Sequence, residues 1–329
     1  MTSFDFIEIT NEEHTVTAYL LPYAATLASV IFQDKNKKPQ DLVLGFSNKK
    51  GYLEDTAYLG RTIGRIANRI KNGEFEFRGK TINLHTNLPP HHLHGGPNGI
   101  AKRDWEVRSH SKGSVTFGIK TDTSVDSYPG DAVIEVTYTI NDKNQLVVEH
   151  SARCTEPGVL ALTNHAYWNL DGSNSIHAHR LHIAASMYLP VDETNLATGE
   201  VASVENTKFD FREPKELGAV KDDDGMVDLD NDWILDKEGP EQLHQLSFWS
   251  NQSGIRMDIQ TSYPAIHLYA AKRLNTKGKE DAVYGANKAL AIEPQLYSSA
   301  VNYPGKFPSV EIAPEKPYSY EIIYSFSHI

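Results

Sequence analysis

The amino-acid sequence predicts an all-β protein, a large antiparallel β-sandwich with few short helices, folded as one domain over residues 1–329. Residues 133–140 alternate between two sets of side chains with a period of two, as a half-buried strand does. A polar turn, residues 141–144, joins them to a second run at 145–150, which indicates an antiparallel hairpin. Helical periodicity fades after a turn or two, and its best stretch is residues 49–58, with Ser47 as the cap.

The same strand pattern recurs along the chain. Residues 75–77 and 81–84 form a second predicted hairpin around the turn 78–80. No linker or fixed repeat divides the chain, and the two long irregular stretches, 85–103 and 191–233, are the expected functional loops. The other predicted strands are residues 15–20, 29–33, 41–44, 105–109, 115–120, 181–188, 255–260, 265–270, 289–293 and 319–326.

Composition narrows the class of function. A hydrophobic fraction of 40% and a charged fraction of 23% are typical of a globular protein with a sizeable core. The formal net charge of -11 argues against nucleic acid and membrane surfaces as partners. Cys154 is the only cysteine, so no intramolecular disulfide can form. With no secretory signal or apolar spanning segment recognised, we expect a cytoplasmic protein.

One histidine stands out. His165 lies among amides and aromatic side chains, in a segment that runs from Asn164 to Leu170. Its ordinary pKa lies near neutrality, so it could transfer protons, and Tyr167 and Trp168 could form an apolar wall for a sugar ring. The alternative is a core histidine whose hydrogen bonds are satisfied by a neighbouring asparagine, either Asn164 or Asn169.

The loop that follows the second hairpin contains a histidine patch at residues 91–99. His92 and His94 in an extended segment would project to one side and could hold a metal. The preferred interpretation is metal-free: Gly95 and Gly96 let the backbone approach a ligand and leave His94 at the lip of a cleft.

Two further charged side chains are ambiguous by themselves. Arg69, beside Asn68, could bind sugar hydroxyls through its planar fork of donors, or it could lie on an exposed helix. Glu293 ends an apolar strand, and Pro294 is expected to end the pairing there. Glu293 could form a structural salt bridge, or it could act with a histidine across a cleft as a base and acid pair.

Seven segments, taken in order, resemble the aldose 1-epimerase (galactose mutarotase) family: GRIANRI, HLHGG, SYPGD, TNHAYWNLDG, YLPVDETNLATGE, FDFR and LAIEPQ. The resemblance runs from about residue 22 to the carboxyl end. It implies a galactose-mutarotase-like β-sandwich that interconverts the α and β anomers of free hexoses by transient ring opening. It also implies that no cofactor and no metal is needed.

The resemblance assigns roles to individual positions. Glu293 matches the general base that takes the proton from the C1 hydroxyl, and His165 matches the general acid that protonates the ring oxygen. The implied sugar-binding residues are His94, Arg69, Asn68 and Asp230.

This chain also departs from the family pattern. The segment 228–233 differs, so Asp228 or Asp232 could replace Asp230. Trp168 stands where phenylalanine is common, and it would either shape the pocket or pack under the strand.

Other functions are also compatible with the sequence. The substrate could be the reducing end of a disaccharide such as maltose, or the sandwich could bind carbohydrate without turnover. A metal-dependent cupin-like enzyme would use His92 and His94, and a glycoside hydrolase would need a second acid in place of the histidine. The expected partner is a small sugar, and the expected state is a monomer or homodimer.

Overall fold

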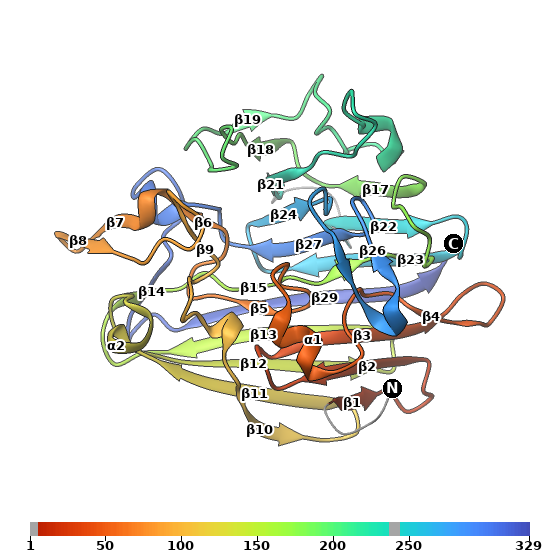
Figure 1. The fold of residues 1–329 in the computed structure, drawn as a ribbon, viewed down its shortest axis with the longest axis horizontal. Coiled ribbons are helices and arrows are strands. Elements are labelled where there is room, and N and C mark those ends of the chain that lie inside the picture. Colours follow the sequence, from red (N-terminus) through yellow and green to blue (C-terminus); the bar gives the residue numbers. More distant parts are fainter. Residues whose placement is uncertain (1–5, 237–243) are drawn as a thin grey trace.

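The computed structural model describes residues 6–236 and 244–329, and most of its ordered elements are β-strands (Figure 1). In the largest sheet each strand runs antiparallel to its neighbours. Its nine strands lie in the order β10 (Glu106–His110), β11 (Ser114–Thr121), β12 (Ala132–Asn141), β13 (Gln145–Arg153), β29 (Tyr318–His328), β23 (Ile255–Thr261), β22 (Leu246–Ser250), β17 (His179–Ile183) and β20 (Lys215–Glu216).

Two smaller sheets complete the framework. The first has six antiparallel strands: β16 (Tyr167–Trp168), β27 (Leu290–Gln295), β24 (Ala265–Tyr269), β21 (Asp230–Ile234), β18 (Met187–Leu189) and β19 (Ala202–Ser203). The second has four: β1 (Ile7–Thr10), β2 (Val16–Leu21), β3 (Thr26–Gln33) and β4 (Pro39–Asp41).

Short strand pairs and helices connect these sheets. The pairs are β5 (Thr62–Ile63) with β15 (Thr163–Asn164), β6 (Arg69–Ile70) with β9 (His92–Leu93), β7 (Glu74–Phe77) with β8 (Lys80–Asn83), β14 (Gly158–Val159) with β28 (Glu311–Ile312), and β25 (Thr276–Lys277) with β26 (Val283–Tyr284). The helices are α1 (Lys49–Glu54), α2 (Thr123–Asp126) and the 3-10 turns Lys71–Gly73, Ile100–Lys102, Leu217–Val220, Lys279–Asp281 and Ala300–Asn302. Within the described ranges, no helix has the length and apolar character needed to cross a membrane.

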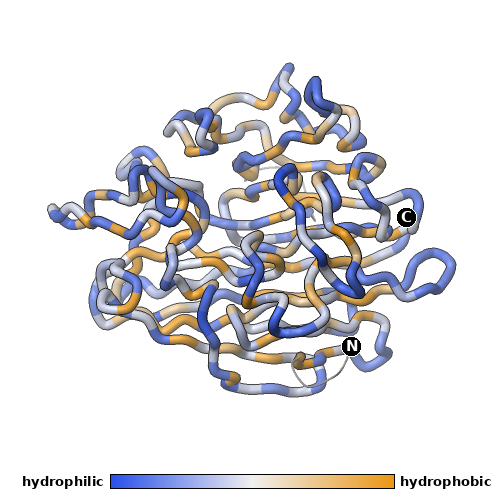
Figure 2. Tube along the Cα trace, viewed as in Figure 1, coloured by the Kyte–Doolittle hydropathy of each residue, from blue (hydrophilic) through white to orange (hydrophobic). Residues whose placement is uncertain are grey.

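The core lies where the sheets pack face to face. Along β12 every second side chain is buried, and Figure 2 shows this alternation of apolar and polar residues in the long strands. Trp168 of β16 is fully buried and packs its ring against Tyr324 and Phe326 of β29, with centroids 4.9 Å and 6.0 Å away. Phe32 of β3 reaches Phe326 at 5.9 Å. The six-stranded and four-stranded sheets therefore both contact the large sheet through aromatic side chains.

Both predicted hairpins are confirmed. Residues 133–140 and 145–150 belong to β12 and β13, and residues 75–77 and 81–84 fall mostly in β7 and β8. The predicted strand 181–188 is wrong as one element, because the chain leaves β17 at Ile183 and enters β18 of another sheet. The predicted strand 41–44 largely falls outside β4, and Val43 forms only an isolated bridge.

Two predicted ends are also wrong. The helix predicted over 49–58 ends at Glu54, and its cap is Asn48, whose side chain accepts a hydrogen bond from the Gly51 N–H. Pairing does not stop at Pro294, because β27 continues to Gln295 beside β24. Proline is tolerated there since its carbonyl faces away from β24 and accepts from Thr163 Oγ1 at 3.0 Å, so no ladder N–H is needed.

Buried histidines couple the stability of this core to pH. Burial lowers the pKa of His150 to about 3, and burial likewise lowers the pKa of His179 to about 4. The unfolded chain takes up protons on these rings as the pH falls below about 6.5, whereas the folded chain does so only near the lowered values. Their contribution therefore makes the folded state less stable as the pH falls through this window.

Between about pH 8 and about pH 5, protonation of His150 in the unfolded chain is expected to lower the free energy of unfolding by about 2 kcal/mol. The variant His150→Gln is expected to lack this part of the pH dependence. Denaturant unfolding of the wild type and the variant at both pH values measures this difference. His110→Gln, on the exposed strand β10, is the matched control. An unchanged pH dependence in His150→Gln would contradict the prediction.

Candidate active site

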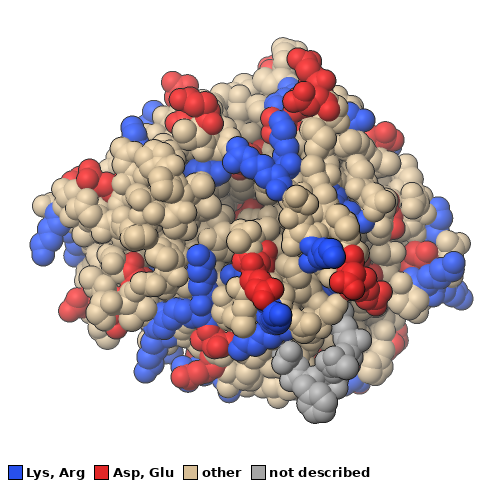
Figure 3. Space-filling view, in the orientation of Figure 1, with Lys and Arg blue, Asp and Glu red and all other residues tan. Residues whose placement is uncertain are grey.

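A pocket of about 280 Å³ opens where the six-stranded sheet meets the loops around β6 and β9. Figure 3 shows a hollow near the centre of this face, with acidic side chains in its depth and basic side chains on its rim. Strands β27, β24 and β21 supply side chains to it. The lining residues are Thr56, Ala57, Tyr58, Asn68, Arg69, Leu88, Leu93, His94, His165, Tyr167, Asp230, His267, Tyr269, Arg273, Leu274 and Glu293.

Glu293 and His165 face each other in this pocket. His165 Nε2 lies 3.4 Å from Glu293 Oε1, and the two residues are only 4% and 2% exposed. Within the described residues, Glu293 Oε1 and His165 Nδ1 are buried without a hydrogen-bond partner. Since buried polar atoms are normally paired, two unpaired ones in a pocket indicate a site for a ligand.

The backbone holds His165 in place between β15 and β16. Its N–H donates to the Arg61 carbonyl at 2.8 Å, and its carbonyl accepts from the Gly60 N–H at 2.9 Å. The predicted alternative, a ring satisfied by Asn164 or Asn169, is wrong. Asn164 Nδ2 instead donates to the Gly60 carbonyl and to the Tyr138 hydroxyl, and Asn169 Nδ2 donates to backbone carbonyls.

Burial shifts the protonation of both groups. It raises the pKa of Glu293 to about 8, against the opposing effect of His267. Burial lowers the pKa of His165 to about 3. Between these values the pair holds one proton, which rests on Glu293, and the two pKa values belong to the pair as a unit. That proton needs to cross only the 3.4 Å gap to give a carboxylate and an imidazolium.

His94 lies beside this pair, at the end of β9. Its ring centroid is 5.3 Å from that of His165, and its Nδ1 accepts from the Asn68 N–H at 3.2 Å, which leaves Nε2 to carry the proton of the neutral ring. Burial lowers the pKa of His94 well below its ordinary value. The side chain therefore offers a neutral N–H donor to the site.

The alternative interpretation, an extended His-x-His segment, is wrong, because His94 adopts φ of 52°. His92 is turned elsewhere and contacts the His85 carbonyl at 2.7 Å and the Tyr128 hydroxyl at 2.8 Å. In residues 6–236 and 244–329 no group of three or more histidine, cysteine, aspartate or glutamate side chains is arranged to hold a metal.

Gly95 and Gly96 are required by the packing of the loop that contains them. Gly95 has φ of 80°, and a Cβ there would lie 1.9 Å from the Gly64 carbonyl oxygen. A Cβ on Gly96 would lie 2.4 Å from the His92 ring. The predicted close approach is therefore to neighbouring parts of the protein, and it fixes the loop that carries His94.

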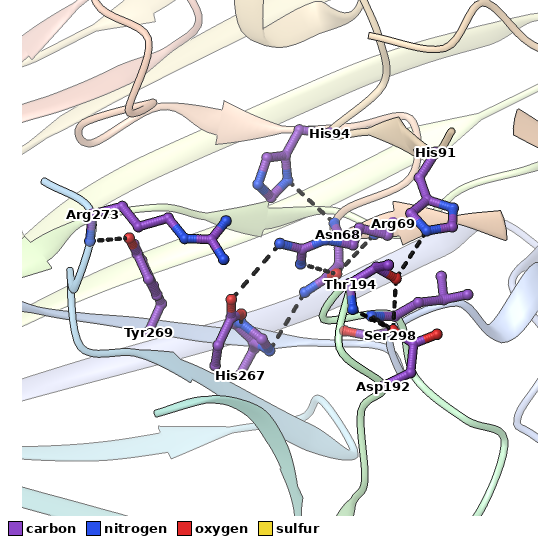
Figure 4. Close-up of polar contacts among 12 residues, drawn as sticks. Asn68, Arg69, His91, His94, Asp192, Thr194, His267, Tyr269, Arg273 and Ser298 are labelled. Carbon is purple, nitrogen blue, oxygen red and sulfur yellow. Dashed lines mark hydrogen bonds and ion pairs between the residues drawn. The ribbon is translucent and has the colours of Figure 1, made fainter. Parts of the chain in front are cut away.

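Arg69 and Asn68 enter the pocket from β6 and the residue before it (Figure 4). The Asn68 side-chain oxygen accepts from an Arg69 guanidinium N–H at 3.2 Å, and another guanidinium nitrogen lies 3.7 Å from Asp230 Oδ2. Arg69 is only 7% exposed, so the alternative of an exposed helix is wrong.

The structure separates the three aspartates around β21. Asp230 lines the pocket, and its pKa is lowered by the hydrogen bond from His267 and by nearby positive charges, which together outweigh burial. Asp232 is buried against His267 and Ser298. Asp228 pairs with Lys272 at 2.9 Å and is not among the residues that line this pocket. Asp230 is therefore the one of these three aspartates that lines the pocket.

Several residues that line the pocket were not predicted from the sequence. His267 occupies the middle of the correctly predicted strand 265–270, and a polar residue between Ile266 and Leu268 is the signal that could have drawn attention to it. Tyr269 and Arg273 follow, and the Arg273 guanidinium extends toward the centre of the pocket in Figure 4. Trp168 packs under the strand, and Tyr167 is the aromatic side chain that lines the pocket.

The pocket of this antiparallel sandwich joins a buried carboxyl, a buried neutral imidazole and several side chains that can donate or accept hydrogen bonds. These features define a class of proteins suited to acid–base chemistry on polyhydroxylated ligands. The aldose 1-epimerase family model matches residues 5–325, and the chain belongs to that family.

Individual relatives agree with this assignment and confirm the predicted fold class. The chain is 36% identical to galactose mutarotase from Mus musculus over 312 residues, which covers 94% of this chain and 90% of that protein. It is 31% identical to aldose 1-epimerase from Escherichia coli over 314 residues, which covers 93% and 91%. The crystal structure of an aldose epimerase homologue from C. elegans superimposes with a TM-score of 0.95 at 51% identity, covering 98% of this chain and 99% of that one.

Proposed function

We propose that the protein is an aldose 1-epimerase that interconverts the α and β anomers of free hexoses, with Glu293 as general base and His165 as general acid. The observation that carries the proposal is the buried pair of Glu293 and His165, 3.4 Å apart, in a pocket lined by hydroxyl-binding side chains. Family membership and relatives named galactose mutarotase support galactose as a substrate, with glucose as the other hexose.

The reaction begins from the form of the pair in which Glu293 is ionised and His165 is protonated. Glu293 takes the proton from the C1 hydroxyl, the C1 oxygen becomes the aldehyde oxygen, and the bond between C1 and the ring oxygen breaks. The ring oxygen receives its proton from His165. C1 then turns about its bond to C2. On closure the hydroxyl that carries the former ring oxygen attacks C1 and gives its proton to His165, while Glu293 returns its proton to the aldehyde oxygen, so the roles of acid and base are reversed.

The surrounding side chains hold the sugar while C1 turns. His94 offers its N–H near the reacting centre, Arg69 and Asn68 bind ring or hydroxyl oxygens, and Asp230 accepts hydrogen bonds from hydroxyls. This chemistry requires proton transfer alone, so we propose that no metal or cofactor takes part. We further propose a cytoplasmic monomer or homodimer, in keeping with the single cysteine.

Polarimetry tests the proposal. Purified protein is expected to speed the equilibration of freshly dissolved α-D-galactose and α-D-glucose in proportion to its concentration. The active form carries the same single proton as the resting pair, so kcat/KM is expected to fall above about pH 8, where Glu293 loses it. Failure to accelerate any aldose, with sugar binding retained in calorimetry, would favour a carbohydrate-binding sandwich instead.

A disaccharide is the second candidate substrate. A cavity of about 320 Å³ adjoins the pocket and shares Thr56, Ala57, Arg273 and Leu274 with it, which leaves room for a second sugar unit beside the reacting one. Maltose belongs in the same polarimetric series for this reason. Release of phenol from an aryl glycoside would indicate hydrolysis and contradict both candidates.

A further inference from the structure

His267 is placed between two carboxylates of the neighbouring strand. Its Nδ1 lies 2.6 Å from Asp232 Oδ1, and its Nε2 lies 3.1 Å from Asp230 Oδ1. The ring is only 4% exposed. A neutral imidazole has one N–H and one acceptor nitrogen, so a ring that donates to a carboxylate through each nitrogen is an imidazolium.

The hydrogen-bond partners of Asp232 are donors, so its carboxylate acts as an acceptor. The Ser298 N–H donates to Oδ2 at 2.7 Å, and the Ser298 hydroxyl donates to Oδ1 at 2.8 Å. Gln295 Nε2 donates to the same hydroxyl oxygen at 2.9 Å, which directs the hydroxyl hydrogen toward Asp232. Asp232 therefore acts as an acceptor at both oxygens, as an ionised carboxylate does.

Asp230 is similarly enclosed. One of its oxygens faces His267, and the other lies 3.7 Å from the Arg69 guanidinium. The two contacts come from different strands and hold the carboxylate at the pocket wall.

His267 is also the cross-strand neighbour of Glu293. The register of β24 and β27 pairs these two residues directly, which puts their side chains on the same face of the sheet. The charged or titratable groups that face the His267 ring, from every element around it, are Asp230 and Asp232 of β21, Glu293 of β27, Arg69 of β6, and the His94 and His165 rings. Removing the positive charge of His267 would leave Glu293 beside two anions, with the guanidinium groups of Arg69 and Arg273 as the other cations that line the pocket.

We propose that His267 is a positioning residue, an imidazolium held between Asp232 and Asp230 that orients Asp230 toward the sugar and favours the proton distribution in which Glu293 is the base. This inference rests on the proposed function. The acid and base themselves remain His165 and Glu293.

His267→Gln keeps a side-chain donor but removes the charge. Loss of a neighbouring positive charge raises the pKa of Glu293, and we expect the alkaline limb of kcat/KM to move up by about one pH unit. The plateau of kcat/KM is expected to fall about tenfold, because the ionised form of Glu293 becomes rarer by the same factor. Loss of packing alone would lower the plateau without moving the limb.

The double variant Asp232→Asn/His267→Gln tests the electrostatic origin of this shift. It removes one negative and one positive charge together, so the alkaline limb is expected to return toward its wild-type position. The proposal would be overturned if the alkaline limb of the kcat/KM profile did not move in His267→Gln. It would also be overturned if the limb stayed shifted in the double variant.

NMR tests the charge of His267 and its effect on Glu293 without a measurement of catalysis. In the wild-type protein with labelled histidine, we expect one ring, assigned through its absence in His267→Gln, to have both nitrogens protonated at about pH 8, above the ordinary histidine pKa. The labelled Glu293 carboxyl is expected to titrate at higher pH in His267→Gln than in the wild type. A neutral His267 ring, or an unchanged Glu293 titration, would refute the inference. A wild-type protein that fails to speed mutarotation would refute the proposed function. The NMR titrations of His267 and Glu293 do not depend on turnover, so they would still test the charge of His267 and its effect on Glu293.

Discussion

Glu293→Gln is expected to lower kcat/KM for galactose by about 10³- to 10⁴-fold. Glutamine has nearly the same shape and remains able to hydrogen bond, but it cannot take the proton from the C1 hydroxyl. Glu293 is only 2% exposed, so bulk water has little access to the position from which it acts. Because the substitution preserves volume, KM is expected to change much less than kcat.

Polarimetry at several galactose concentrations measures both constants. Glu149→Gln, on the exposed side of β13, is the matched control and is expected to keep wild-type activity. Thermal unfolding of each variant shows whether the fold is retained. A folded Glu293→Gln protein with more than about a tenth of wild-type kcat/KM would contradict the role of Glu293 as the base.

His165→Gln is expected to lower kcat/KM by about 10²- to 10⁴-fold, since the amide donates a hydrogen bond but does not release its proton to the ring oxygen. If the two residues work as one unit, the double variant Glu293→Gln/His165→Gln is expected to be about as inactive as the more damaged single variant. His110→Gln is the control at an exposed histidine.

Independent action of the two residues would give a different result. In that case the two single losses would multiply in the double variant. Separate measurement of galactose affinity by calorimetry is needed here, because His165 contacts the rings of His94 and Tyr167 and a shorter side chain alters the pocket wall.

The architecture followed from the sequence wherever one face of a strand is buried and the other is open. Residues 133–140 alternate because Ile134 and Val136 point into the core, while Glu135 lies on the partly exposed face. The same reasoning failed at 181–188, where apolar side chains continue through the point at which the chain changes sheets. Local periodicity records burial, but it does not record which sheet provides it.

The roles of the site residues were harder to predict from the local sequence pattern. Glu293 and His165 each also had a structural interpretation, which local sequence alone favoured, and only the family resemblance assigned them roles. What distinguishes them physically is their burial and their 3.4 Å separation, which depend on how distant segments pack. His267 was missed because a single histidine in an apolar strand looks like a core residue until Asp230 and Asp232 are placed against it.

The position of β29 has a consequence for how the protein is made. Tyr318–His328 follows both neighbours in the sequence, yet it lies between β13 and β23 in the large sheet. Until β29 leaves the ribosome, these two strands each present an unpaired edge to solvent, and such edges recruit other chains. The nascent protein is thus most exposed to aggregation late in its synthesis, when chaperones have the largest sheet surface to shield.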